Sequence, residues 1–192
     1  MALLQAAKSF FLRRPLIANG LVYGTLYVGA EFSQQTITKK VLTKPPEELD
    51  KPTLARYAIM GTFIYSPMLF FWYRWLDKFL PGTARKTIVK KLLMDQFLFT
   101  PPLLGVFFTG MSIMEGNPPF EELQQKFVPT FARSCLFWLP AQTANFIFIP
   151  PQFRVIYVGA CAFAWVNILC WVKRQNFDEE ETKLEKEAIQ SK

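Results

Sequence analysis

The sequence predicts an all-α integral membrane protein, a helix bundle with four transmembrane helices and one further apolar helix. The first observation is composition, because 51% of the 192 residues are hydrophobic and 20 of them are phenylalanine. The second is distribution, because long stretches nearly free of charged side chains alternate with charged loops. A helix needs about 20 apolar residues to cross about 30 Å of hydrocarbon. Four stretches approach this length.

The expected spans follow one another along the chain at 15–35, 57–73, 92–114 and 155–172. Aromatic residues at the end of the second span favour the membrane–water interface. A fifth apolar stretch, at 128–149, contains arginine, proline and amide side chains, so it either crosses the bilayer or lies interfacially. If it crosses, the two termini lie on opposite sides of the membrane, and otherwise they share a side.

Three segments are expected along the chain. A basic amphipathic segment at 1–14 precedes a single membrane-embedded helical domain at 15–174, and a charged tail at 175–192 is either a frayed helix or disordered. The first thirty residues contain no acid, which is typical of an organelle-import sequence. An interfacial helix leading into the first span explains the same pattern. A polar loop at 39–56 is expected to separate the first two spans.

Composition argues against several classes of function. The chain has no histidine, and Cys135, Cys161 and Cys170 form no CxxC pair, so no Cys/His metal site is expected. The sequence has no phosphate-binding loop, dinucleotide-binding glycine motif or serine-hydrolase elbow, so we expect neither an enzyme nor a cofactor. The net charge of +7 comes from basic residues beside apolar stretches. That placement favours lipid headgroups over nucleic acid.

Asp95 is a carboxylate inside an expected span, where a charge is costly unless it is paired or hydrated. One interpretation is a pore-lining acid that favours cations or gates by titration. The other is an interfacial residue beside Lys91, which lies four residues earlier and shares its helix face.

A second polar group belongs to the fifth apolar stretch and its C-terminal border. It comprises Arg133, Gln142, Asn145 and Arg154. Gln142 and Asn145 are three residues apart, so on a helix they face one way and suit interhelical hydrogen bonds. Glu31, at the end of the first span, is a candidate partner for one of the arginines.

Gly20 and Gly24 form a GxxxG pair in the first span, a spacing that lets another helix approach closely. The partners expected are the lipid bilayer and either further copies of this chain or another membrane protein, without nucleic acid.

Several short motifs occur in an order and at spacings that are specific, although each motif alone is weak. They are Trp72, Tyr73, Leu76 and Asp77 with Pro81 and Gly82; Lys91, Asp95, Gln96 and Pro101; Trp138, Gln142, Asn145 and Phe146; Pro150 and Arg154; and Trp165. From about 15 to 171, this pattern resembles the Mpv-seventeen and 22-kDa peroxisomal membrane protein family. Within it, the runs at 110–113 and 125–127 and the Gly159, Cys161, Phe163 series are most similar to the Mpv-seventeen-like branch.

Two departures from the family pattern change how polar groups face. Leu139 separates Trp138 from Pro140, which the family often has adjacent. The family's acid in the first span falls at Ala30, and here Glu31 follows instead. Each shift turns a side chain by about 100° on a helix, so we do not expect Glu31 to face a pore.

The resemblance implies four spans and residence in the mitochondrial inner membrane or, alternatively, the peroxisomal membrane. It also implies a channel-like role in membrane homeostasis and reactive oxygen species metabolism. The acid-free N-terminus favours mitochondria. One hypothesis is therefore a channel whose polar path includes Asp95, Gln96, Arg133, Gln142, Asn145 and Arg154. The other is a non-conducting structural protein that assembles with partner helices through Gly20 and Gly24.

Overall fold

The computed structural model describes residues 10–11, 13–43, 45–165 and 167. Within this part of the chain every regular element is a helix, which confirms the predicted all-α class. The predictions for the first nine residues and for the tail, together with Cys170, lie outside the described residues.

The first helical pair packs α2 against one continuous helix. Helix α2 (Pro15–Gln35) is followed by η1 (Thr36–Leu42). The continuous helix comprises α3 (Lys51–Ile59), η2 (Met60–Tyr65) and α4 (Ser66–Phe79). The predicted loop at 39–56 is therefore too long, because η1 extends to Leu42 and α3 begins at Lys51. Asp50 caps α3, because its Oδ1 accepts the Thr53 N–H at 3.1 Å and Pro52 suits the first turn.

A second continuous helix begins seven residues before the predicted span at 92. It comprises α5 (Arg85–Met94), η3 (Asp95–Phe99) and α6 (Thr100–Glu115). The basic run at its start is helical because each long side chain can extend away from the apolar body. Gly116 ends α6 with a φ of 77°, a left-handed conformation that glycine adopts without strain.

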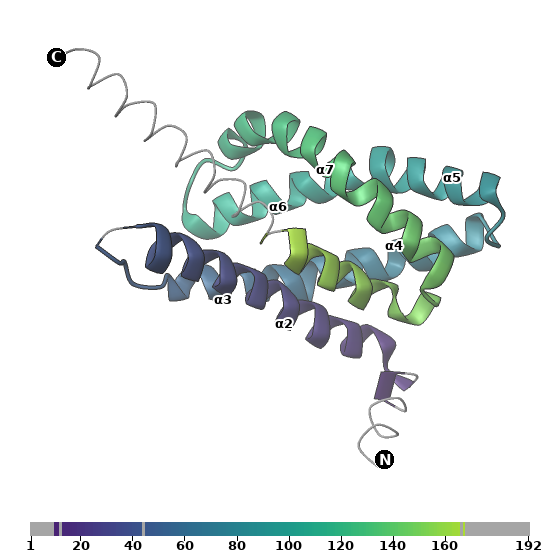
Figure 1. Ribbon diagram of the computed structural model, residues 1–192, viewed down its shortest axis with the longest axis horizontal. Coiled ribbons are helices and arrows are strands. Elements are labelled where there is room, and N and C mark those ends of the chain that lie inside the picture. Colours follow the sequence, from purple (N-terminus) through teal and green to yellow (C-terminus); the bar gives the residue numbers. More distant parts are fainter. Residues whose placement is uncertain (1–9, 12, 44, 166, 168–192) are drawn as a thin grey trace.

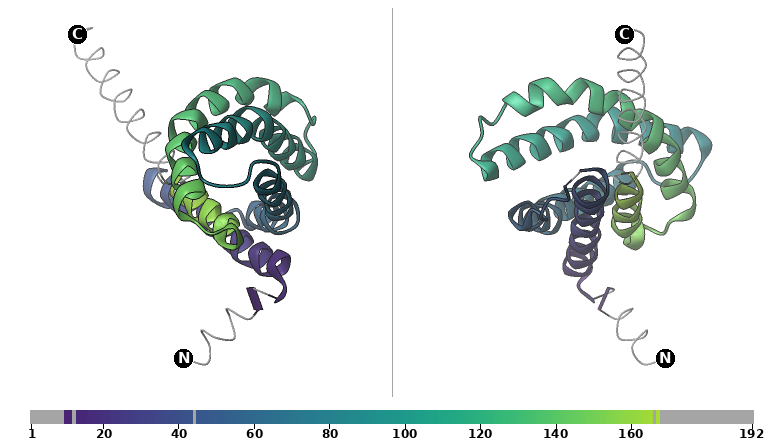
Figure 2. Two further views of the ribbon diagram at one scale, coloured as in Figure 1. Left: turned by 90° about the vertical axis from the view of Figure 1, so that its right-hand side faces the viewer. Right: turned by 60° about the vertical axis from the view of Figure 1, so that its left-hand side comes forward.

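The chain then continues into α7 (Glu121–Phe148), η4 (Pro151–Phe153) and a helix over 154–165. The fifth apolar stretch thus forms the larger part of α7, which contains Pro129 and Pro140. In Figure 1, α5, α6 and α7 lie over α2, α3 and α4, and α7 packs along both α5 and α6. The views in Figure 2 show the helices arranged around a common centre.

Prolines account for the two wide π-helical turns inside the continuous helices. Pro67 follows η2, and Pro101 and Pro102 follow η3. A proline has no N–H to donate one turn back, so the preceding carbonyls lose their regular partners and the helix widens. In η3 the Thr100 hydroxyl compensates by donating to the Asp95 carbonyl oxygen at 2.9 Å.

Two of the described helical stretches are long and apolar enough to cross a membrane, Lys51–Phe79 and Arg85–Glu115. Only 28% and 22% of their most apolar windows are buried within the chain. A core helix of a soluble protein would be mostly buried, so this outward apolar surface fits contact with lipid. Four spans and the course of α7 through a bilayer stay predictions.

Candidate functional site

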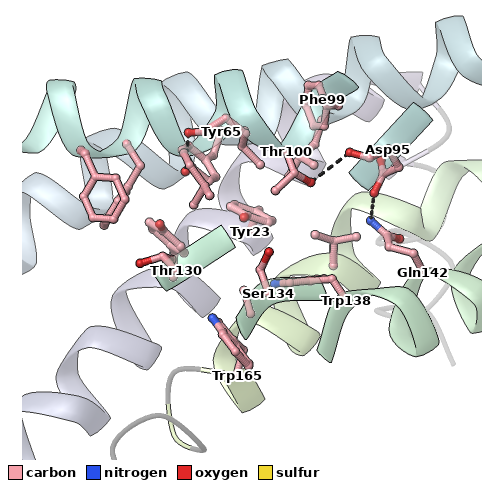
Figure 3. A pocket seen from close by; sticks show the side chains of 18 of the residues that line it. Tyr23, Tyr65, Asp95, Phe99, Thr100, Thr130, Ser134, Trp138, Gln142 and Trp165 are labelled. Carbon is pink, nitrogen blue, oxygen red and sulfur yellow. Dashed lines mark hydrogen bonds between the residues drawn. The ribbon is translucent and has the colours of Figure 1, made fainter. Parts of the chain in front are cut away.

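A cavity of about 520 Å³ lies between the two layers of helices. Figure 3 shows its walls, to which Tyr23 of α2, Tyr65 of η2, Phe99 of η3, Ser134 of α7 and Trp165 each contribute. Helices distant in sequence therefore build one space. We call it the first cavity.

Asp95, at the start of η3, is the centre of a hydrogen-bonded group at one end of the first cavity. Only 4% of this residue is exposed. Its Oδ1 accepts the Trp72 Nε1–H at 2.8 Å, and its Oδ2 accepts from Gln142 Nε2 at 2.8 Å. Gln142 Nε2 also donates to the Tyr73 hydroxyl at 2.7 Å, and Gln142 Oε1 accepts from Asn145 Nδ2 at 2.7 Å.

The carboxylate of Asp95 therefore has neutral donors and forms no ion pair with any Lys or Arg of the described residues. The pairing considered with Lys91 is wrong, although the two are four residues apart on a helix. Lys91 Nζ instead donates to Asp77 Oδ1 at 2.8 Å. The four-residue spacing would let Lys91 and Asp95 pair on one helix face, but Lys91 lies beside α4 and pairs with Asp77 of that helix instead.

The first cavity is long. Tyr57 and Tyr73 both line it and are sixteen residues apart (73 − 57) on one continuous helix, which corresponds to about 24 Å at 1.5 Å per residue. Glu31 also lines it, from the C-terminal end of α2. The prediction that Glu31 does not face a pore stays a prediction, whereas its expected pairing with an arginine is wrong, because its partner is Gln35 at 2.9 Å.

The remaining walls of the first cavity are mostly aromatic and aliphatic, with hydroxyl groups among them. Tyr27 stacks with Tyr23 and Tyr65 at centroid separations of 5.6 and 5.5 Å, and Phe107 meets Tyr65 edge-on. Two acids and no Lys or Arg are among the described residues that line it. A cation or a hydrogen-bond donor suits such a lining better than an anion does.

A second cavity, of about 460 Å³, lies beyond the Asp95 group and is lined by Asp77, Lys91 and Arg154. Arg154 Nη1 donates to both carboxylate oxygens of Asp77, so one acid holds two cations. Phe146 lines this cavity, and its ring lies 6.0 Å from that of Tyr73, which lines the first cavity. The linings of the two cavities therefore meet at these two rings.

The structure divides the residues predicted for a polar path into four sets. Asp95, Gln142 and Asn145 come together, while Arg154 belongs to the Asp77 cluster. Gln96 is buried but turns towards α7, where Nε2 donates to Ser134 Oγ at 3.2 Å. Arg133 is exposed on α7 and does not join the expected polar group, because its face of the helix points outward.

The turn motif Trp72, Tyr73, Leu76 and Asp77 supplies both cavities. Trp72 bonds Asp95, Tyr73 bonds Gln142, Asp77 binds two cations, and Leu76 is fully buried beside them. Sequence reasoning missed the tyrosines that line the first cavity. The four-residue spacing of Tyr23 and Tyr27 on one helix face was the available signal.

Gly20 and Gly24 pack inside the chain, both facing Thr62 of η2. A Cβ on Gly24 would lie 1.9 Å from Thr62 Oγ1 and 3.4 Å from Thr62 Cα. The close approach expected of the GxxxG pair is therefore made to the chain's own second helix.

The model of the Mpv17 / PMP22 family matches residues 112–170. The Mpv17-like protein of Xenopus laevis is 33% identical over 176 residues, an alignment that covers 91% of this chain and 85% of that protein. The chain belongs to the Mpv17 / PMP22 family. The resemblance predicted from its motifs is thereby confirmed.

Two further relatives widen the comparison within the family. The Mpv17-like protein of Bos taurus is 32% identical over 85% of this chain and 80% of its own length. Peroxisomal membrane protein 2 of Bos taurus is 30% identical over 81% of each chain. These relatives agree with the predicted residence in a mitochondrial or, alternatively, a peroxisomal membrane. No solved structure matches the chain.

Proposed function

We propose that this chain is a channel-like protein of an organelle membrane, the mitochondrial inner membrane in the first place, with four spans. Its role would be in membrane homeostasis and reactive oxygen species metabolism, as membership of the family suggests. The observation that carries the proposal is the alignment of two cavities along one membrane-length helix. Residues from Tyr57 to Asp77 line them in succession, and twenty residues (77 − 57) cover about 30 Å, the thickness of the hydrocarbon core.

The lining of the first cavity supports a preference for cations. Asp95 and Glu31 are acids without a cation beside them in the described residues, and the hydroxyls of five tyrosines can replace part of a solute's hydration shell. The five are Tyr23, Tyr27, Tyr57, Tyr65 and Tyr73.

The barrier in the path is the group of side chains between the cavities. Tyr73, Gln142 and Phe146 are buried there, and their hydrogen bonds and ring contact close the passage. In this proposal, opening requires Gln142 to release either the Tyr73 hydroxyl or Asp95. Helices interrupted by prolines next to this group provide a wall that can move.

The experiment is single-channel recording of purified protein in a planar bilayer, with the parent beside Asp95→Asn. Asparagine keeps one acceptor oxygen but no charge, so we expect discrete openings in both proteins and a reduced preference for cations in the variant. Glu122→Gln is the matched control, because Glu122 is an acid on α7 that lines neither cavity. Its preference should equal that of the parent.

A silent bilayer, with the protein shown to be folded and inserted, would contradict a channel and favour the non-conducting structural alternative. Equal ion preference in the parent and Asp95→Asn would remove Asp95 from the path. The structure weakens one motive for the structural alternative, because Gly20 and Gly24 already pack against Thr62 of the same chain.

A further inference from the structure

The second cavity holds an excess of buried positive charge. Lys91 and Arg154 have side chains that are 3% and 5% exposed, and both pair with the carboxylate of Asp77, which is 22% exposed. The three groups carry a net charge of +1 in surroundings of low dielectric. A buried charge without a counter-charge is costly, so the site favours an added anion.

Both cations keep donors that Asp77 does not use. Lys91 Nζ carries three protons and donates to two acceptors, Asp77 Oδ1 and the Gly82 carbonyl oxygen at 3.3 Å. Arg154 donates from Nη1 to Asp77 and from Nε to the Ile149 carbonyl oxygen at 3.3 Å. Its Nη2 donates to no group among the described residues. An oxyanion in the cavity can accept these remaining protons.

The segment that contributes Asp77, Thr83 and Lys91 to the second cavity is basic, although its exposed cations do not line the cavity. Six cations and one acid, Asp77, occur between 74 and 91, and five of the cations are exposed. They are Arg74, Lys78, Arg85, Lys86 and Lys90. The α5 helix begins at Arg85, two residues after Thr83, which lines the cavity, and no side chain caps it. Its free N–H groups favour a negative ligand at the same end.

Asp95 does not neutralise this cluster. Both of its carboxylate oxygens accept hydrogen bonds from Trp72 and Gln142, and it lines the first cavity rather than the second. Phe146 lies on the other flank of the cations, with Lys91 Nζ 5.8 Å and Arg154 Cζ 5.3 Å from its ring centroid. The open side of the cluster therefore faces the second cavity.

We propose that the second cavity is a binding site for a phosphate group, held by Lys91 and Arg154 beside Asp77. Arginine and lysine together are the usual protein donors to phosphate oxygens. The turn at 80–84 joins the two helices suited to span the membrane, so the site lies where they leave the bilayer. Either a lipid headgroup or a free phosphate can supply the phosphate group there. The site binds its ligand whether or not the chain conducts.

The test measures binding of inorganic phosphate to the full chain in alkyl maltoside micelles, which contain no phosphate. Melting temperature is followed as phosphate is added and compared with chloride at equal ionic strength, because a ligand that binds the folded state raises its stability. We expect phosphate to raise the melting temperature of the parent above the chloride value.

Asp77→Asn is the informative variant, because a purely structural ion cluster and an anion site predict different results. Removing the competing carboxylate should make phosphate bind about tenfold more tightly, since both cations then lack a counter-charge. Arg154→Gln should bind about tenfold more weakly. Lys90→Gln is the matched control, because it removes an exposed cation next to Lys91 in sequence and should leave binding unchanged.

A second arm replaces inorganic phosphate with short-chain phosphatidic acid, and with diacylglycerol as its phosphate-free control. Stabilisation by phosphatidic acid alone assigns the site to a lipid headgroup, and stabilisation by inorganic phosphate as well assigns it to a free phosphate group. No stabilisation of the parent or of Asp77→Asn by either probe overturns the proposal. Equal losses in Lys90→Gln and Arg154→Gln also overturn it, because binding would then depend on surface charge alone.

Discussion

Two aspartates eighteen residues apart (95 − 77) occupy opposite electrostatic surroundings. Asp95 lies in the first cavity among neutral donors, two of which bond its oxygens at 2.8 Å. Asp77 lies in the second cavity between Lys91 and Arg154. Among the described residues, the acids of the first cavity therefore have no cationic partner, whereas the second cavity contains two cations for one acid.

The difference shows that the sign of each cavity comes from the packing of helices, not from the acid itself. Lys91 is closer in sequence to Asp95 than to Asp77, yet it pairs with Asp77. The helix that carries Lys91 packs so that this side chain meets the end of α4, while Asp95 one turn later meets Trp72 and Gln142. The following predictions test this difference between the two aspartates and their surroundings.

The largest effect should come from Asp77→Asn, measured in phosphate-free micelles. The variant leaves two buried cations without a counter-charge, which should cost about 3–5 kcal/mol in the free energy of unfolding. Asp95→Asn keeps one acceptor and removes no ion pair, so it should cost about 1–2 kcal/mol. Reversible chemical unfolding followed by tryptophan fluorescence measures both.

The control for this pair is Glu122→Gln, which breaks the exposed ion pair between Lys126 and Glu122. Surface pairs of this kind contribute less than about 1 kcal/mol. If Asp77→Asn costs no more than Asp95→Asn, the contrast between a charged and a neutral environment is lost.

A smaller effect is expected for Gly24→Ala, which displaces α2 and with it one wall of the first cavity. The added methyl overlaps Thr62, so the free energy of unfolding should fall by about 1–3 kcal/mol. Gly105→Ala is the matched control, since its Cβ meets nothing within 4 Å and alanine favours a helix by about 1 kcal/mol. A melting temperature that falls in Gly24→Ala and rises in Gly105→Ala supports an internal contact at Gly24. Changes of the same sign in both variants contradict it.

The smallest effect concerns Asp50, a half-buried aspartate that lines neither cavity and serves as a reference for the other two. Hydrogen bonds from Thr53 lower the pKa of Asp50 below its ordinary value. A lowered pKa means that the carboxylate stabilises the folded state at pH values above its unfolded pKa, and that this contribution is lost as pH falls through the folded pKa. The melting temperature of Asp50→Asn should therefore lie below that of the parent at neutral pH.

The gap in melting temperature between the parent and Asp50→Asn should begin to narrow as pH falls below about 4, the ordinary aspartate pKa, and should close below the lowered folded pKa. A gap that stays constant over this range would show that the cap does not depend on charge. Asp77 and Asp95 are present in both proteins, so their own titration cancels in the comparison.

Hydropathy alone predicted the helical class and most of the helix positions. The α-helix at 15–35 has the predicted bounds, because its apolar run begins at Pro15 and gives way to polar residues after Gln35, but helical structure continues through η1 to Leu42. The starts of the next two helices were missed, since Lys51 and Arg85 begin helices in charged segments where no apolar period is visible. Asp50, a capping residue, was the signal for the first of these.

The sequence also singled out Asp95, Gln142, Asn145 and Arg154 as polar residues at membrane depth, because such residues are costly there and need partners. It could not choose the partners. Arg133 has the same chemistry as Arg154 but is exposed, and Glu31 pairs with Gln35 and not with an arginine.

By itself, then, the sequence determined that the chain is helical and apolar enough for a membrane, and it identified the family through motifs at fixed spacings. Both properties depend on local periodicity and composition, which the chain carries in linear order. The tertiary structure alone decided that Lys91 pairs with Asp77, that Gly24 packs on Thr62, and that one cavity is lined by acids and the next by two cations and an acid. These depend on which helix faces meet, and a helix of given sequence can present its polar side chains to several neighbours.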